Sequence, residues 1–256
     1  MQRSFAKGIA ASLGLLAMVA VSVFPTASAL HSPNHYSLFG DAQYVTPGNA
    51  SNRAVQLRSD ASPGFGGVDY GVEAGLTFSE LTTLSTDYKF ESDDSCGGGS
   101  PRFQVEVTDP VTGDTGNIHV YIGPPPNYTG CPSGVWLNTG DLLEGANPID
   151  TTQLDGGAFY DPYAAALAKY GDYVVTGIQL VVDGGWFFAD GEQTAQFDNT
   201  LINSTLFTYE PTGAEGRELC KNGGWMTLTD DSGRAFKNQG DCVSYFSTGG
   251  KNKARG

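Results

Sequence analysis

From residue 36 onward, short runs of β-branched and aromatic residues alternate with clusters of Gly, Pro, Asn and Asp. In "RFQVEV", Phe103, Val105 and Val107 alternate with Gln104 and Glu106, which predicts a strand with one buried face and one solvent-exposed face. Further strands are predicted in "SLFGDAQYV", "RAVQLRS", "LTTLSTDYKF", "NIHVYIG", "YVVTGIQLVVD" and "TAQFDNTLINSTLFTY". These are enough strands for two sheets, so the pattern predicts an all-β antiparallel sandwich.

One short helix interrupts the strands at "YAAALAKY", residues 163–170, a segment of high helix propensity. Asp161 offers an N-cap oxygen, Pro162 suits the first helical position, and Gly171 can adopt the left-handed conformation that ends a helix. We expect this inserted helix to pack on one edge of a sheet, because a helix of this length is marginal in isolation.

The composition changes around Glu210. Residues 211–218 are polar, contain Pro and Gly and lack apolar periodicity, which predicts a linker. Residues 219–256 hold too few large apolar side chains for an independent core without a crosslink. We therefore expect a sandwich domain over residues 30–210, a linker over 211–218, and a disulfide-crosslinked tail over 219–256 with a disordered end.

Residues 1–29 have the pattern of a signal peptide. Arg3 and Lys7 precede an apolar stretch, and Ala27 and Ala29 form the A-x-A pattern of a cleavage site. The apolar stretch is shorter than the ~20 residues that span a bilayer, and no later stretch is long enough either. The sequence therefore predicts cleavage after Ala29 and secretion, without membrane insertion.

The chain is acidic, with a net charge of −14. Because residues 1–29 carry two basic and no acidic residues, their removal would change the net charge to −16. Such a surface repels the phosphates of nucleic acids and anionic lipids, so we expect neither as a partner. Neutral glycans, cations and basic proteins remain, although acidity also serves solubility. The oligomeric state is left open.

Four cysteines fit an oxidising compartment and two disulfides. Three connectivities are possible, and we favour the pairing of sequence neighbours, Cys96 with Cys131 and Cys220 with Cys242. A zinc site is disfavoured because the chain has no C-x-x-C pair and its histidines lack the required spacing.

Two segments resemble parts of known proteins. "CKNGGW…FKNQGDCVSYF" resembles a C-terminal cassette that recurs on uncharacterised secreted bacterial proteins, and "CGGGSPRF" with "VVDGGWFFADGEQTAQFDNTLIN" resembles the β-sandwich of the same group. The resemblance implies export and a jelly-roll-like sandwich, with no reaction attached. "FDNTLIN" is also similar to the last strand of jelly-roll carbohydrate-binding modules, from which no binding residue is carried over.

The candidate ligand-binding residues are aromatic and acidic. In "DGGWFFADGE", Trp186 and Phe188 stand beside acids that include Glu192, a combination that suits a sugar ring stacked on an indole. The same aromatics could instead close the end of the core. Trp225, in the tail, could likewise pack inside the disulfide loop or face outward as a binding residue.

A calcium site is a further candidate. Asp41, Asp183, Asp190 and Asp198 would meet at one edge if the first and last strands paired, and they would then offer the oxygen ligands that calcium prefers. The alternative is that these acids lie separately on solvated turns. Calcium would serve as a structural ion.

Two enzymatic alternatives receive less support. His119 and Tyr121 share one face of a strand and could act as base and acid in a polysaccharide lyase, but the expected arginine motif is missing and the acidic charge disfavours a polyanionic substrate. His31 could chelate copper in a monooxygenase only if cleavage fell after Leu30.

We therefore interpret the sequence as a secreted, non-enzymatic protein that binds an extracellular glycan or another cell-surface component. A structural envelope or matrix protein is the nearest alternative. The two differ in one observable feature, because a binding protein should expose Trp186 or Trp225 and a scaffold should bury both.

Overall fold

The computed structural model describes residues 35–60, 64–144 and 147–256. The predicted leader, its cleavage site after Ala29 and the copper candidate His31 lie outside the described residues. Secretion therefore stays a prediction. Among the described helices, none is long and apolar enough to cross a membrane.

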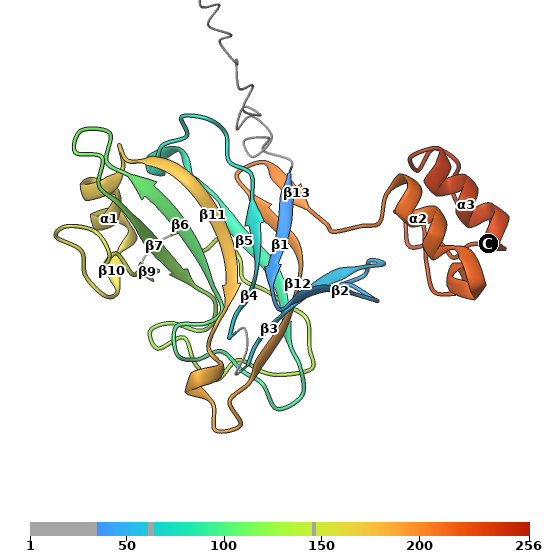
Figure 1. Ribbon diagram of the computed structural model, residues 1–256, viewed down its shortest axis with the longest axis horizontal. Coiled ribbons are helices and arrows are strands. Elements are labelled where there is room, and N and C mark those ends of the chain that lie inside the picture. Colours follow the sequence, from blue (N-terminus) through green and yellow to red (C-terminus); the bar gives the residue numbers. More distant parts are fainter. Residues whose placement is uncertain (1–34, 61–63, 145–146) are drawn as a thin grey trace, which may run out of the picture.

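Two antiparallel sheets form a sandwich, with the first sheet facing the viewer in Figure 1. The first sheet has the order β1-β4-β11-β6-β7, with β1 at Tyr36–Gly40, β4 at Gly66–Tyr70, β11 at Val174–Val182, β6 at Arg102–Thr108 and β7 at Thr115–Tyr121. The second has the order β2-β3-β12-β5-β8, with β2 at Ala42–Val45, β3 at Ala54–Ser59, β12 at Gln193–Ile202, β5 at Leu84–Phe90 and β8 at Leu137–Asn138, and β13 (Thr205–Phe207) pairs with β12.

The core lies between the two sheets. Phe103, Val105 and Val107 are buried, as the alternation in β6 predicts. They share one hydrophobic cluster with residues of the second sheet that include Phe90 and Phe197. The prediction of an all-β, jelly-roll-like antiparallel sandwich is confirmed.

Strand β11 departs from strict alternation. The sequence pattern places Val174, Thr176 and Ile178 on one face, but the pairing of β11 with β6 shifts register between Val175 and Gly177. This β-bulge turns Val175 into the core and leaves Thr176 exposed. The bulge therefore places Gly177 on the outer face of the first sheet.

Strand β4 was not predicted, because its segment "GFGGVDYG" is rich in glycine. It lies between β1 and β11 and brings Asp69 into the middle of the first sheet. The predicted strand over residues 37–45 is in fact two strands, since the chain leaves β1 of the first sheet and enters β2 of the second at Asp41.

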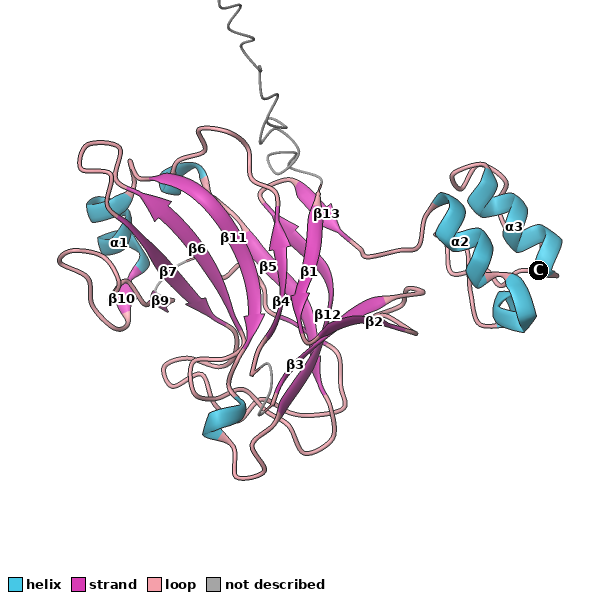
Figure 2. Ribbon diagram, viewed as in Figure 1, coloured by secondary structure: helices cyan, strands magenta, loops and turns pink. Residues whose placement is uncertain are grey.

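The inserted helix α1 (Tyr163–Tyr170) forms where it was predicted, beside the short pair β9 (Pro148–Ile149) and β10 (Asp161–Pro162) next to β7 (Figure 2). Its predicted caps are wrong. Pro162 is the N-cap, and the carboxylate of Asp161 instead accepts hydrogen bonds from Thr151 and Lys169. Gly171 has a φ of −55° and stays right-handed.

The tail folds into short helices that lie to one side of the sandwich (Figure 1): α2 at Gly213–Leu219, the 3-10 segment η4 at Lys221–Met226, and α3 at Gln239–Ser247. The predicted linker is thus mostly helix. Helices α2 and α3 pack closely because Gly216 has no side chain; a Cβ there would lie 2.2 Å from the ring of Phe246. The end of the chain, predicted to be disordered, is docked, with the buried Ala254 donating its N–H to Asp230.

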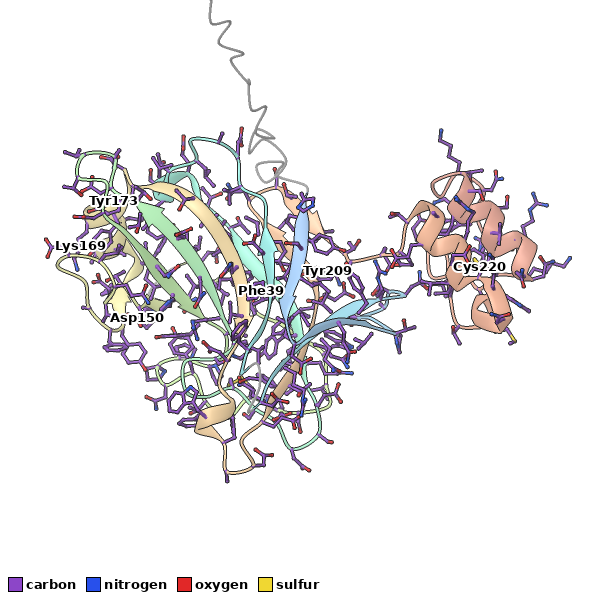
Figure 3. The ribbon with its side chains drawn as sticks, viewed as in Figure 1. Phe39, Asp150, Lys169, Tyr173, Tyr209 and Cys220 are labelled. Atoms are coloured by element: carbon purple, nitrogen blue, oxygen red, sulfur yellow. A yellow bond between two sulfur atoms is a disulfide. The ribbon has the colours of Figure 1, made fainter. Side chains whose placement is uncertain are left out.

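Both disulfides form as predicted, Cys96 with Cys131 in the sandwich and Cys220 with Cys242 in the tail (Figure 3 labels Cys220). They fit the oxidising compartment that the cysteine count predicts. The tail is tied to the sandwich by polar contacts, since Asn52 binds the backbone of Thr229 and Arg53 pairs with Glu215.

Candidate functional site

A groove of about 360 Å³ lies over the outer face of the first sheet. Its lining is mostly polar and comes from four neighbouring strands and the ends that adjoin them: Asp69, Tyr70, Val72, Gln104, Glu106, Asn117, Thr176, Gly177 and Gln179. The register explains the grouping, because Asp69, Gln179, Gln104 and His119 are successive cross-strand partners along one row. We call this the sheet groove.

Hydrogen bonds join the polar side chains of that row. Gln104 Nε2 donates to Gln179 Oε1, and Gln179 Nε2 donates to Asp69 Oδ1, each at 3.3 Å. Arg102 donates to Gln104 Oε1 and forms two bonds of 2.6 Å with the carboxylate of Asp183. The groove wall is therefore ordered before any ligand arrives, which lowers the entropic cost of binding.

Trp186 lies on η3 (Gly185–Phe187), which follows Asp183 at the end of β11. Its side chain is 75% exposed, so the interpretation as a core plug fails for this residue. The ring has a firm support: it meets Phe187 edge to face at 5.9 Å, and Phe187 packs on Gly97 and Gly98 beside the Cys96–Cys131 disulfide. The indole can thus present a face to a ligand.

Trp186 does not line the sheet groove, but hydrogen bonds join its loop to the groove: Arg102 donates both to Asp183, which precedes η3, and to the groove residue Gln104. A Cβ on Gly98 would lie 3.2 Å from Trp186, and a Cβ on the adjacent Gly99 would lie 3.3 Å from Tyr121. Tyr121 is the cross-strand partner of Arg102, two positions beyond the groove residue Gln104. A ligand that contacts both the indole and the polar wall must therefore be long enough to pass over Arg102.

The other predicted ligand residues are less available. Phe188 is half-buried and faces Gly97. Glu192 accepts two hydrogen bonds of 2.8 Å from Arg58, and this contact lowers the pKa of Glu192 to about 2. Trp225 is half-buried against the small core of the tail, so it serves packing there.

The four predicted calcium ligands each have a different protein partner. Asp41 pairs with Arg58, Asp183 with Arg102, Asp190 accepts from the backbone of Glu192, and Asp198 accepts from Asn49 and Ser51. In the described ranges no group of three or more His, Cys, Asp or Glu side chains is arranged to hold a metal ion. Calcium binding stays an untested prediction, without a cluster to support it.

His119 and Tyr121, the candidate lyase pair, share Asp150 as a partner at the edge of the first sheet (Figure 3). Tyr121 donates to Asp150 at 2.6 Å, and His119 Nδ1 lies 3.6 Å from the same oxygen. Burial favours protonation of Asp150, but His119, Thr152 and Tyr121 outweigh it and hold its pKa below the usual range. His119 Nε2 is shielded and has no hydrogen-bond partner among the described residues. Both side chains are therefore covered on the outer face of the sheet, and little of either is accessible to a substrate.

A second cleft, of about 480 Å³, separates the sandwich from the tail. Asn49, Ser51 and Asn199 line it, and all three already bind the buried Asp198. No exposed aromatic platform comparable with Trp186 borders this cleft within the described chain, since Tyr245 and Phe246 pack in the core of the tail. The sheet groove is the better candidate site.

No protein-family model matches the sequence, and no curated protein matches it. Among solved structures, the chain is similar to an exo-beta-agarase at 15% identity with a TM-score of 0.37, covering 72% of this chain and 26% of the agarase chain. It is also similar to the xyloglucanase domain of NopAA, a type three effector from Sinorhizobium fredii, in complex with cellobiose, at 12% identity with a TM-score of 0.28, covering 68% and 99%. Likeness of this degree carries no argument about what this chain does.

Proposed function

We propose that this chain is a non-enzymatic protein that binds an extracellular glycan along the outer face of the first sheet. One observation carries the proposal: an exposed tryptophan follows the end of β11, the strand that contributes Thr176, Gly177 and Gln179 to a groove lined by amide and carboxylate side chains. Sugars present a C–H face that stacks on an indole, and their hydroxyls pair with such polar groups.

The nearest alternative is a purely structural envelope or matrix protein. The exposure of Trp186 favours the binding protein, which is expected to expose Trp186 or Trp225 where a structural protein buries both. Catalysis at His119 and Tyr121 is not part of the proposal, because both side chains bind or face Asp150 inside the sheet edge.

Replacing Trp186 with alanine is expected to weaken glycan retention by about 30-fold, since truncation of a tryptophan that stacks on the ligand costs about 2 kcal/mol. The melting temperature should stay close to that of the unmodified protein, because the side chain is 75% exposed. A glycan array followed by calorimetry on the best binder measures the first effect, and a thermal melt the second.

Met226→Ala is a matched control, because Met226 is 67% exposed but lies in the tail. It should leave glycan retention unchanged. If no glycan on the array is retained by the unmodified protein, or if both variants bind equally well, the chain is not a glycan-binding protein of the kind proposed.

A further inference from the structure

The sheet groove is negatively charged. Asp69 and Glu106 are the only charged side chains among its lining residues. Asp69 accepts a single bond of 3.3 Å from the neutral amide of Gln179, and the side chain of Glu106 is exposed. In the part of the chain that the structure describes, neither carboxylate pairs with a lysine or arginine.

Arg102, on the same strand as Gln104 and Glu106, does not neutralise these carboxylates. Arg102 precedes the groove residue Gln104 by two residues on β6, but both of its terminal nitrogens donate to Asp183 at 2.6 Å. Its remaining contacts are with Gln104 and the carbonyl of Gly99. Arg102 is therefore the ion-pair partner of Asp183, at the start of the loop that carries Trp186. The two carboxylates of the groove have no counter-charge from it.

The whole molecule adds to this local field. With a net charge of −14, the chain raises the concentration of cations near its surface and repels anions, and a groove over a low-dielectric floor concentrates that field. A neutral sugar would form hydrogen bonds with the amides of the groove, but it carries no positive charge to pair with the two carboxylates. An ammonium group would form charge-assisted hydrogen bonds with them, which are stronger than neutral ones.

The positions of the two carboxylates suit an oligosaccharide better than a single sugar. Asp69 on β4 pairs with Gln179, whereas Glu106 on β6 pairs with Gly177, two residues away along β11. Two strand spacings of about 4.8 Å and two residue rises of about 3.3 Å separate their Cα atoms by roughly 12 Å. Each carboxylate would therefore meet a different sugar of a chain.

We propose that the sheet groove selects an oligosaccharide that carries free amino groups, with Asp69 and Glu106 accepting hydrogen bonds from its ammonium groups. The proposal rests on the glycan-binding function argued above and narrows its ligand class. Gly177 has no side chain and so leaves room for the carboxylate of Glu106, whose Oε2 would lie 3.2 Å from a Cβ at this position. Trp186 stacks on a sugar ring in either case, so it contributes affinity without regard to charge.

The test compares oligomers of glucosamine and of N-acetylglucosamine of equal length, at mildly acidic pH and low salt. We expect glucosamine oligomers to bind about tenfold more tightly, the combined effect of two partly exposed charge pairs. The double variant Asp69→Asn/Glu106→Gln should remove this preference, so that both oligomers bind it with equal affinity. Added salt should weaken only the glucosamine complex.

A matched variant, Glu144→Gln/Asp172→Asn, changes the net charge equally at exposed positions outside the groove and should keep the preference. Equal affinity for both oligomers, with binding still dependent on Trp186, would overturn the amino-sugar proposal and leave glycan binding standing. If neither oligomer nor any neutral or anionic glycan binds in a Trp186-dependent way, the proposed function itself fails.

Discussion

Replacing Cys220 and Cys242 with alanine is expected to unfold the tail while the sandwich stays folded. The tail has its own small core, made of Cys220, Leu228, Phe236, Cys242, Phe246 and Ala254. A core of this size supplies only about 3–5 kcal/mol. The disulfide spans 22 residues of sequence, and closing a loop of that length contributes roughly 3 kcal/mol under the chain-entropy model. Its loss therefore removes most of the stability of the tail.

Native-state hydrogen exchange measures this expectation segment by segment. In the double variant, amides of α2 and α3 should lose protection, and amides of β6 and β11 should keep it. The Cys96→Ala/Cys131→Ala variant is the matched control, because that disulfide lies in the core cluster of the sandwich and its loss should lower sandwich protection instead. Full protection of α2 and α3 without the Cys220–Cys242 bond would mean that docking contacts alone fold the tail.

The sandwich and both disulfides could be predicted because each follows from local signals. Alternation in β6 identifies its buried face, and cysteines close in sequence pair in the structure. The tail was harder. Residues 213–219 show no apolar periodicity, since α2 packs on α3 through Gly216 and so lacks the stripe of large side chains that reveals most helices.

The exposed Trp186 was identified as a candidate from its neighbours in sequence, but the sheet groove was not. Its polar residues are spread over β4, β11, β6 and β7, and each one alone looks like an ordinary solvated position on a strand. Only the strand order brings them together. That order places β4, a glycine-rich strand that was not predicted, beside β11, and the bulge places Gly177 on the outer face next to the carboxylate of Glu106.

The packing of Trp225 and the separation of the four aspartates also depend on contacts between segments that are far apart in the sequence. The sequence shows which residues could act together. However, Asp41 lies between β1 and β2 and Asp198 lies on β12, and the distance between them depends on how the strands pair. Arginines at positions 58 and 102 then take two of the four carboxylates as ion-pair partners. No motif spacing reports such long-range pairings.

Raising the pH from about 4 to about 7 is expected to cost the folded protein about 2 kcal/mol at a single residue, Asp198. This side chain is fully buried on β12, where it accepts hydrogen bonds from Asn49, Ser51 and Asn199. Burial disfavours the charged carboxylate and outweighs these bonds, so the pKa of Asp198 is raised to about 6 from the ordinary 3.8.

The direction of the effect follows from proton binding. Between about pH 4 and about pH 6, the folded state keeps the Asp198 proton that the unfolded state has released, so stability falls as pH rises through this range. The cost is absent below the unfolded pKa and complete above the folded one. The pKa values of Glu192 and Asp230 are lowered to about 2, so the stability that these two carboxylates contribute is lost only at more acidic pH.

Urea unfolding at a series of pH values, on the unmodified protein and on Asp198→Asn, measures the contribution. The asparagine variant should lose most of the fall in unfolding free energy between about pH 4 and about pH 7, whatever its absolute stability, because its amide does not titrate. Asp94 is the matched control: burial raises its pKa to about 6 as well, but it is partly exposed, so Asp94→Asn should remove a smaller part of the slope. An unchanged slope in Asp198→Asn would show that this carboxylate is ionised throughout the range, and that the hydrogen bonds from Asn49, Ser51 and Asn199 outweigh its burial.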